Sequence, residues 1–294
     1  RNRAYRLGKL GERLCSIIPS EDSFMVLSWA ALFFLHTKER VKQDYLKFTP
    51  TVMNNALENG NILSAFHAGM TCFFARLWTG EHLGSLEESI RPINNRLIEI
   101  GQEDIGVHFK PILQLVLNLA HECPSGGNPT ILTGEVMNEA EYISLIAPPT
   151  EKGFITRFWF CKMVLAYYFG SYELAEKCSD IIRSHNAGLK WTFHKNSFFS
   201  LPSNFYSAMI YNMRYRETRQ RKYLRKSRQC KRFLERCHST GNPNATPHLR
   251  LLEAEELSIK SKSNAIEVSE AYDRAAEIQA QKKLAHLEAL TYER

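Results

Sequence analysis

Several features are missing from this sequence of 294 residues, and each absence excludes a class of protein. The 15 glycines and 11 prolines are too few for a collagen-like or low-complexity chain. A bilayer span needs about 20 apolar residues, whereas the longest apolar run, residues 24–35, has twelve. A second apolar stretch, residues 154–169, contains Arg157 and Lys162. Both stretches therefore predict buried helices and no membrane span.

Close cysteine pairs are also missing. The seven cysteines are odd in number and widely spaced, and no two form a CxxC pair. This excludes a disulfide scaffold and a zinc site built from such pairs. Because free cysteine is among the most buried residue types, the pattern predicts reduced, buried thiols in an intracellular protein, and we expect the chain to be cytoplasmic.

The sequence contains none of the common catalytic signatures. A phosphate-binding loop and the motifs of zinc proteases, serine hydrolases and protein kinases are absent. His121, Glu122 and Cys123 are adjacent and would point in different directions on a helix, so we expect no shared metal ion. The carboxylates at 253, 255 and 256 lie in a polar stretch that predicts a solvated face. We assign no catalytic, cofactor-binding or metal-binding residue, and expect no enzyme activity from this chain.

Helical periodicity runs through the sequence instead, and strand signals are nearly absent. Aromatic-rich helices are followed by more polar ones at residues 62–78 and 83–100, and again at 154–169 and 171–186. Residues 247–259 and 264–282 form a third pair with fewer aromatics. Such pairs bury their apolar faces only by stacking. The predicted fold is all-α, with stacked antiparallel helix pairs in a tetratricopeptide (TPR)-like α-solenoid.

The predicted domain organisation is one helical region over residues 1–294, with soft joints near 122–137 and 239–246. The first residue is arginine, which suggests a piece of a larger protein. Gly170 and Tyr172 mark a tight turn between two helices, in the phrase Gly-x-Tyr-x-x-Ala that is typical of TPR-type turns. A helix end at this point favours a left-handed backbone, which glycine adopts at low cost.

The basic charge is concentrated in residues 214–237. This segment has eleven Lys and Arg against two Glu, a net charge of +9, whereas the whole chain carries +7. We expect one basic amphipathic helix, which could bind phosphates, anionic lipid or calmodulin. The other interpretation is a solenoid helix with one docked face and a solvated back. Candidate contacts with an anionic partner are Arg219, Lys222, Arg225, Lys226, Arg228, Lys231 and Arg232.

Several phrases resemble one helical region of a known family. These phrases are residues 74–88, 132–135, 160–175, 248–255, 265–267 and 272–275. They resemble, in this order, the region that follows the AAA-type (Orc1-like or STAND) ATPase module of large hybrid Ser/Thr kinase and histidine kinase signalling proteins. The resemblance implies a helical, non-catalytic region. It transfers no catalytic residue, because the kinase and ATPase motifs of the family are absent here. The corresponding helix in that family is commonly rich in lysine, which favours a solvated back.

Three functions remain open from the sequence. The first is a scaffold or regulatory region of a multidomain signalling ATPase or kinase, whose partners are the neighbouring domains or other proteins. The alternative is a module that binds nucleic acid or an anionic surface through residues 214–237, although few aromatics accompany the charges and nucleic acid is the less expected ligand. The third is a helical enzyme without a recognised motif. No cofactor is expected for either of the first two functions.

Overall fold

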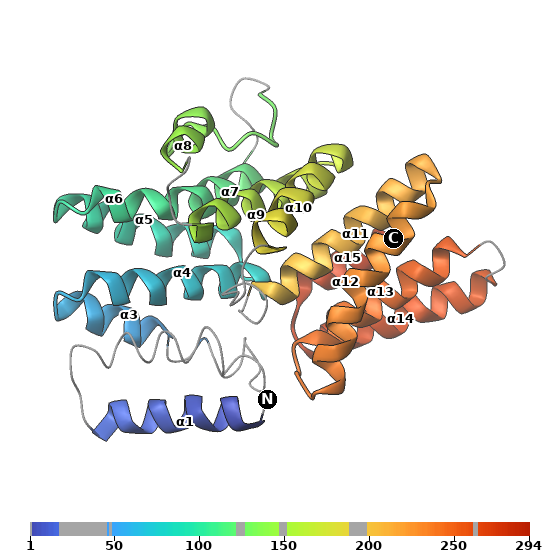
Figure 1. Cartoon of the computed structure of the whole chain (residues 1–294), viewed down its shortest axis with the longest axis horizontal. Helices are drawn as coiled ribbons and strands as arrows, with labels where there is room; N and C mark the ends of the chain where they lie inside the picture. The colour runs from blue at the N-terminus through green and yellow to red at the C-terminus, as the bar shows by residue number, and fades with distance from the viewer. Residues whose placement is uncertain are drawn as a thin grey trace. The chain divides into compact units, whose positions relative to one another are not determined.

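The chain is helical wherever regular secondary structure is assigned. The computed structural model describes residues 2–17, 46, 49–121, 127–146, 152–187, 199–260 and 264–294. These ranges contain no β-strand, so the predicted all-α fold class is confirmed. The helices (Figure 1) are α1 (Asn2–Ile17), α3 (Thr49–Glu58), α4 (Ile62–Trp78), α5 (Leu83–Glu99), α6 (Glu103–Gly106), the 3-10 helix η3 (Val107–Phe109), α7 (Lys110–Ala120), α8 (Glu139–Leu145), α9 (Lys152–Tyr168), α10 (Tyr172–Ala187), α11 (Ser200–Thr218), α12 (Arg221–Ser239), α13 (Ala245–Ile259), α14 (Ala265–Gln281) and α15 (Ala285–Tyr292).

The chain divides into two compact units. Unit 1 consists of Arg1–Gly80 and Asn196–Arg294, and unit 2 consists of Glu81–Lys195. The soft joints expected near 122–137 and 239–246 do not coincide with the boundaries between the units. The described part of residues 122–137 is a loop inside unit 2, and residues 240–244 link α12 to α13 inside unit 1. Residues 122–126 and the apolar run at 24–35 lie outside the described residues.

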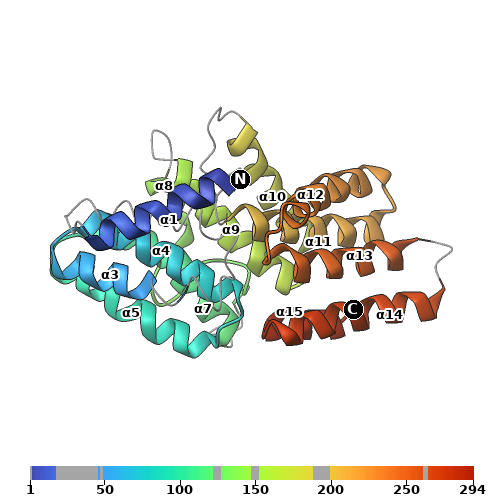
Figure 2. The same cartoon turned by 90° about the horizontal axis from the view of Figure 1, so that it is seen from below.

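Unit 1 is built from stacked helix pairs. α3 packs against α4, α11 against α12, and α13 against α14, while α13 also packs against both α11 and α12 (Figure 2). The predicted pair at 247–259 and 264–282 is therefore confirmed as α13 and α14. α15 packs on α14 and follows it after a short turn. The pair α13 and α14 thus stacks on the pair α11 and α12, which is the solenoid-like stacking expected from the sequence.

Two ring contacts join the early and late segments of unit 1. The indole N–H of Trp78, the last residue of α4, donates to Nε2 of His248 on α13 at 2.9 Å. The ring of Phe74 meets Phe199 edge-on, with centroids 4.8 Å apart. These side chains are buried, so α4 contributes to the same core as helices that lie more than a hundred residues later in the chain.

Unit 2 contains the predicted pair at 154–169 and 171–186 as α9 and α10, which pack together. α7 packs against α5 and α9. The remaining predicted pair, 62–78 with 83–100, has its helices at α4 and α5, but the boundary between the units falls between them. α4 pairs with α3, and α5 with α7. Helical periodicity in the sequence located α4 and α5, but it did not show which helices pack against them.

Polar side chains hold the loop of unit 2 that precedes α8. Lys162 of α9 is 6% exposed, forms an ion pair with Glu139, and donates to the carbonyl of Thr130 at 3.3 Å. Asn118 of α7 donates to the carbonyl of Ile131 at 2.8 Å. The lysine that interrupts the apolar stretch 154–169 is therefore a structural anchor, because it neutralises a half-buried carboxylate and satisfies a loop carbonyl.

The Gly170 turn has the predicted conformation. Gly170 has φ +71°, its N–H donates to Tyr167 O at 3.2 Å, and Ser171 N–H donates to Ala166 O at 2.8 Å. This bonding is the Schellman pattern, in which two orphan carbonyls at the end of a helix are satisfied. The ring of Tyr172, at the start of α10, lies 6.1 Å from that of Tyr167. The turn thus sends α10 back along α9.

The buried thiols agree with the sequence pattern as far as they are described. Five cysteines are free and buried: Cys72, Cys161, Cys178, Cys230 and Cys237. Burial raises the pKa of Cys178 to about 12, so this thiol is protonated and unreactive near neutral pH. The side chains of the other two cysteines, at 15 and 123, lie outside the described residues.

Candidate functional site

The basic segment is split between two helices, so the single helix predicted over residues 214–237 is wrong. α11 ends at Thr218 and α12 begins at Arg221. Arg219 adopts a left-handed backbone with φ +57°, and its N–H donates to Tyr215 O at 2.8 Å. No glycine or proline signals this break. The cation at the end of α11 interacts favourably with the negative end of the helix dipole.

One face of α12 is buried and the opposite face carries arginine. The buried residues repeat at helical spacing: Tyr223, Ser227, Cys230, Leu234 and Cys237. The arginines repeat at i, i+4, i+7, i+11 and i+15 and are exposed: Arg221, Arg225, Arg228, Arg232 and Arg236. We call these five residues the arginine face. At 1.5 Å of rise per residue they form a straight row of about 22 Å. Phe233, beside the buried residue Leu234, is half-buried.

The lysines of α12 lie beside the arginine face and contact aromatic rings or a carboxylate. Lys226 Nζ lies 5.0 Å from the ring of Tyr211, and Lys222 Nζ lies 4.8 Å from that of Tyr223. Lys231 Nζ donates to Oε2 of Glu256 at 2.5 Å. Burial acts to raise the pKa of Glu256, but the hydrogen bond and charge of Lys231 outweigh it and hold that pKa below its usual value.

Within the described residues, three members of the arginine face form no ion pair: Arg221, Arg225 and Arg232. Arg228 does, with Nε 3.3 Å from Oε1 of Glu256 on α13. Arg219, another predicted contact, lies with its guanidinium 6.0 Å from the ring of Tyr215. The structure thus places Arg225, Arg228 and Arg232 in one exposed row, while Lys222, Lys226 and Lys231 flank it.

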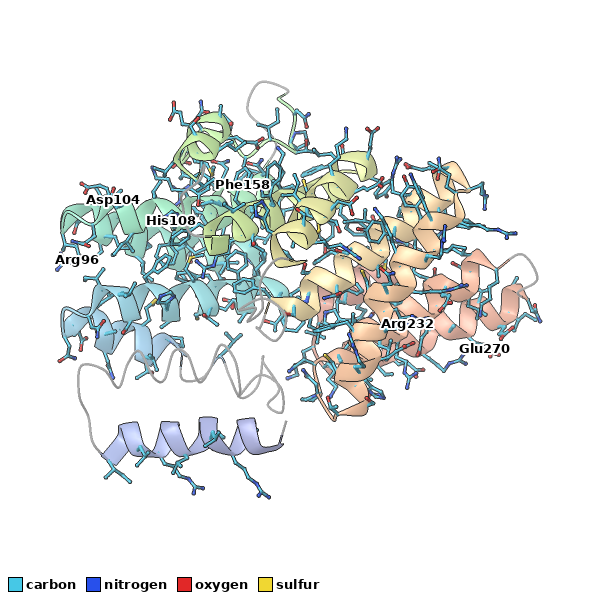
Figure 3. All side chains as sticks on the ribbon, in the orientation of Figure 1. Arg96, Asp104, His108, Phe158, Arg232 and Glu270 are labelled. Atoms are coloured by element: carbon cyan, nitrogen blue, oxygen red, sulfur yellow. The ribbon has the colours of Figure 1, made fainter. Side chains whose placement is uncertain are left out.

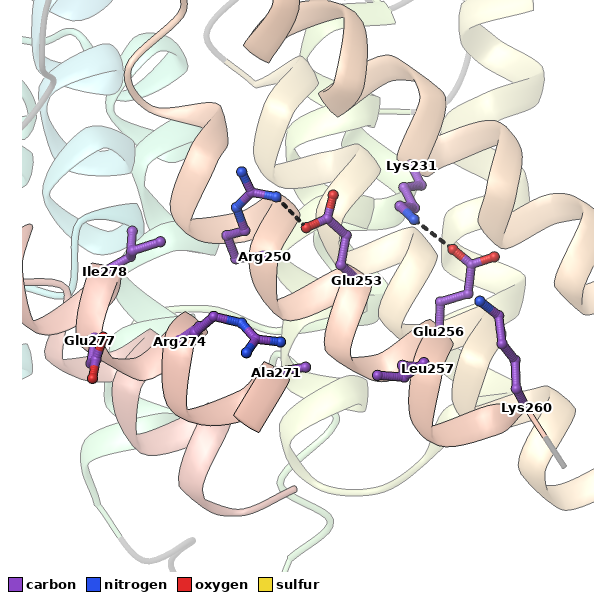
Figure 4. Close-up of a pocket in the computed structure, with 10 residues that line it drawn as sticks. All are labelled: Lys231, Arg250, Glu253, Glu256, Leu257, Lys260, Ala271, Arg274, Glu277 and Ile278. Atoms are coloured by element: carbon purple, nitrogen blue, oxygen red, sulfur yellow. Dashed lines mark hydrogen bonds and ion pairs between the residues drawn. The ribbon is translucent and has the colours of Figure 1, made fainter. Parts of the chain in front are cut away.

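A charged groove of about 560 Å³ runs where α12, α13 and α14 meet (Figure 4). Its charged lining includes Lys231, Arg250, Glu253, Glu256, Lys260, Arg274 and Glu277. Most of these groups engage one another or a neighbour: Arg250 meets Glu253 at 2.6 Å, as Lys231 meets Glu256. The groove is therefore a mixed-charge surface rather than a site of one sign. Arg250, Glu253 and Glu256 recur every three residues along α13, but the pairing of Glu256 with Lys231 of α12 is not local in the sequence.

Glu255 was expected on a solvated face, and this prediction is wrong. Its side chain is fully buried, accepts a hydrogen bond from Tyr272 Oη at 3.0 Å, and lies 3.1 Å from Nη2 of Arg216. Burial raises the pKa of Tyr272, and the neighbouring carboxylate raises it further. Arg216 also donates to Ser258 at 2.7 Å. Together these groups join α11, α13 and α14 by a buried polar network that the periodicity of α13 did not reveal.

Two histidines are held neutral by burial. Burial, with the nearby charge of His286 as a second cause, lowers the pKa of His248 to about 3. Its Nδ1 lies 3.0 Å from Asn244 O and its Nε2 accepts from Trp78, which requires the Nδ1–H tautomer because indole only donates. In unit 2, burial, with the charge of Arg157 as a second cause, lowers the pKa of His108 to about 4. The ring of His108 stacks on Phe154 at 3.5 Å.

The described residues contain neither a metal-binding cluster nor a helix able to cross a membrane. No group of three or more histidine, cysteine or acidic side chains in the described ranges is arranged to hold a metal ion. His121 instead lies 3.1 Å from Glu87, while Glu122 and Cys123 lie outside those ranges. No helix in the part of the chain that the structure describes is long and apolar enough to cross a bilayer.

Comparison with known proteins does not assign the chain to a family. A scan against protein-family models found no match, and searches of curated proteins and of solved structures found none either. The arginine face, the groove beside it and the polar network of Glu255 are therefore the features that point to a function.

Proposed function

We propose that this chain is a non-catalytic helical scaffold in the cytoplasm that regulates a larger signalling protein, one that joins a protein kinase to an AAA-type ATPase, through intramolecular or protein–protein contacts. The observation that supports it most is the arginine face of α12, which stands on a rigid, buried opposite face and keeps three arginines without an ion pair among the described residues. Stacked helices offer such surfaces without a catalytic group. The resemblance of residues 132–135 and 160–175 supports the choice of parent.

The absence of a catalytic role is also part of the proposal. A helical enzyme needs polar groups that converge on a pocket and remain available to a substrate. In the groove of Figure 4, Glu253 and Glu256 are engaged by Arg250 and Lys231. This supports a surface for contacts over an active site.

Crosslinking in the full-length parent protein tests the scaffold. We expect Lys222 and Lys226, which flank the arginine face, to crosslink to a neighbouring domain or a bound protein. Replacing Arg225 and Arg232 with serine should weaken that crosslink and change the activity of the parent. The control is Arg96→Ser, an exposed arginine in unit 2. Absence of any crosslink, together with unchanged parent activity on deletion of residues 200–260, would remove the proposal.

The row of exposed arginines also favours a second candidate, a contact with nucleic acid or an anionic surface. Arginine binds phosphate through two parallel hydrogen bonds, and phosphate contacts release counterions. Binding to duplex DNA, RNA or anionic vesicles should then fall steeply as salt rises. Binding that is absent, or that does not depend on salt, excludes this candidate.

A further inference from the structure

α14 carries an acidic row that matches the arginine face of α12. Its carboxylates repeat at i, i+3, i+6 and i+10 and all are exposed: Glu267, Glu270, Asp273 and Glu277. We call these four residues the acidic face. The buried residues of α14, Ala275, Ala276 and Gln279, lie on its other side. Both α12 and α14 pack against α13, and Figure 3 labels Arg232 on the first and Glu270 on the second.

The two faces are largely unused within one chain. Among the described residues, Glu267, Asp273 and Glu277 form no ion pair, as is also true of Arg221, Arg225 and Arg232. Glu270 meets Arg274 at 3.4 Å on the surface of the same helix. No ion pair in the described part of the chain joins the arginine face to the acidic face. One molecule thus presents two charged rows of opposite sign that its own fold does not bring together.

We infer that the arginine face of one molecule pairs with the acidic face of a second copy of this chain. The arginine row follows one line along α12, whereas Glu267, Glu270 and Asp273 turn around α14 by about 60° per step. The acidic face is therefore a broad patch about 15 Å long, against which the arginine row can lie. The guanidinium group takes a carboxylate through two parallel hydrogen bonds, a geometry that lysine does not offer. The five cations of the row are all arginine, and the lysines of α12 lie outside it.

Other anionic partners fit this surface less well. The side of the arginine face toward α13 carries carboxylates at Glu235 and Glu256, which repel a phosphate backbone. Tyr223 is buried, so it offers no ring for base stacking. The apolar side of α12 is packed inside unit 1, so the helix has no apolar face to insert into a bilayer. An acidic helix also meets these two carboxylates, but it needs neither a ring for base stacking nor an apolar face on α12.

The association should be weak and controlled by salt, because both faces are exposed to water. The screening length falls from about 30 Å at 0.01 M salt to about 3 Å at 1 M. Sedimentation equilibrium at these two salt concentrations measures the change, and we expect the association constant to fall by at least about tenfold. This inference rests on the proposed role in protein–protein contacts.

A charge swap tests the pairing directly. One variant carries Arg221→Glu, Arg225→Glu and Arg232→Glu, and the other carries Glu267→Lys, Asp273→Lys and Glu277→Lys. Each should lose self-association at low salt, because like charges then face each other. An equimolar mixture of the two variants should associate again, because the reversed, now negative row of α12 in the first variant can pair with the reversed, now positive row of α14 in the second. All six positions are exposed, and circular dichroism checks that both variants fold.

The control reverses cations of unit 2 instead, at Arg96, Lys110 and Lys177, with the same change in net charge. It should keep the self-association of the unmodified chain at low salt, because both charged faces are intact and its lower net charge adds no repulsion. A monomer at every concentration and salt overturns the inference, as does an association that the two variants leave unchanged. Binding of duplex DNA or anionic vesicles by a monomeric chain also overturns it, and assigns the face to a polyanion. None of these results bears on crosslinks to the parent, so the scaffold proposal is tested separately.

Discussion

Glycines at helix ends share one backbone conformation here and differ in what surrounds them. Gly60, Gly80 and Gly170 have φ +73°, +71° and +71°. An added Cβ would meet nothing within 4 Å at Gly60 or Gly170, but at Gly80 it would lie 2.1 Å from Nδ1 of His286 on α15. Replacing Gly170 with alanine therefore measures backbone strain alone, whereas the same replacement at Gly80 measures backbone strain together with a collision with His286.

Gly170→Ala should lower the free energy of unfolding by about 1–2 kcal/mol, the cost of a left-handed backbone for a residue with a Cβ. Gly80→Ala should cost about 1–3 kcal/mol more, the scale of overpacking. Urea unfolding of both variants measures the difference. Adding His286→Ala to Gly80→Ala should remove the excess, because the colliding ring is gone. Equal losses in the two single variants would mean that α15 does not approach Gly80 as described.

The buried carboxylate of Glu255 is the other single residue on which much depends. Replacement by alanine leaves Arg216 and Tyr272 without their shared acceptor, and breaking a buried pair costs about 3–5 kcal/mol. We expect Glu255→Ala to lower the free energy of unfolding by about 3 kcal/mol or more. Glu253→Ala, on the same helix but paired with Arg250 at the surface, should cost less than about 1 kcal/mol. Similar losses at 253 and 255 in denaturant unfolding would contradict the network.

Among the elements, α9 shows how an apolar helix uses one charged residue. Its lysine at 162 reaches the loop before α8, where Glu139 also accepts from Leu132 N–H at 2.7 Å. The ion pair thus connects α9 to the first residue of α8, and the hydrogen bonds of Glu139 to Leu132 and of Lys162 to Thr130 hold the loop between them. The loop depends on that connection, because its backbone groups are otherwise bound only by side chains such as Gln114 and Asn118 and by a few turn bonds.

Lys162→Met should destabilise unit 2 by about 3 kcal/mol, because Glu139 keeps its charge in a half-buried place without a cation. Amide hydrogen exchange at Leu132 should accelerate as the loop loosens. The control is Lys177→Met on α10, whose exposed pair with Glu173 contributes at most about 0.5 kcal/mol. Adding Glu139→Gln to Lys162→Met should recover part of the loss. Unchanged exchange at Leu132 in Lys162→Met would show that the lysine does not hold the loop.

Among the described residues, each unit contains a histidine whose pKa is lowered by burial, His248 in unit 1 and His108 in unit 2. The pKa of His248 is lowered to about 3 and that of His108 to about 4, whereas an unfolded histidine titrates near 6.5. As pH falls below about 6.5 the unfolded chain binds protons that the folded chain does not, so stability falls with pH down to these lowered values. Above about 6.5 the contribution of both groups is fully present.

Between pH 7 and pH 5 we expect His248 alone to reduce the free energy of unfolding by about 2 kcal/mol. His108 adds a smaller loss because it is partly exposed. Urea unfolding at the two pH values measures the change. The His248→Asn variant should be less stable than the unmodified chain at pH 7, but its free energy of unfolding should fall less between pH 7 and pH 5. An equal loss in both proteins would mean that His248 is not the group that titrates.

Local patterns along the sequence determined the helical class, most helix positions and the Gly170 turn. The positions of α9, α10, α13 and α14 follow from apolar residues at helical spacing and from turn residues, which act over a few neighbours. The same spacing placed Arg225, Arg228 and Arg232 together on one face, because residues at i, i+3 and i+7 share a side of any helix. These predictions needed no knowledge of partners.

Only the tertiary structure decided which helices pair and which charges are buried. Glu253, Glu255 and Glu256 lie in one polar stretch of sequence, yet only Glu255 of the three is fully buried, because Arg216 of α11 and Tyr272 of α14 pack against it. The break at Arg219 carries no glycine or proline, so the local signal favoured one helix where there are two. Burial is a property of what packs against a residue, and spacing along a single chain segment contains no record of that.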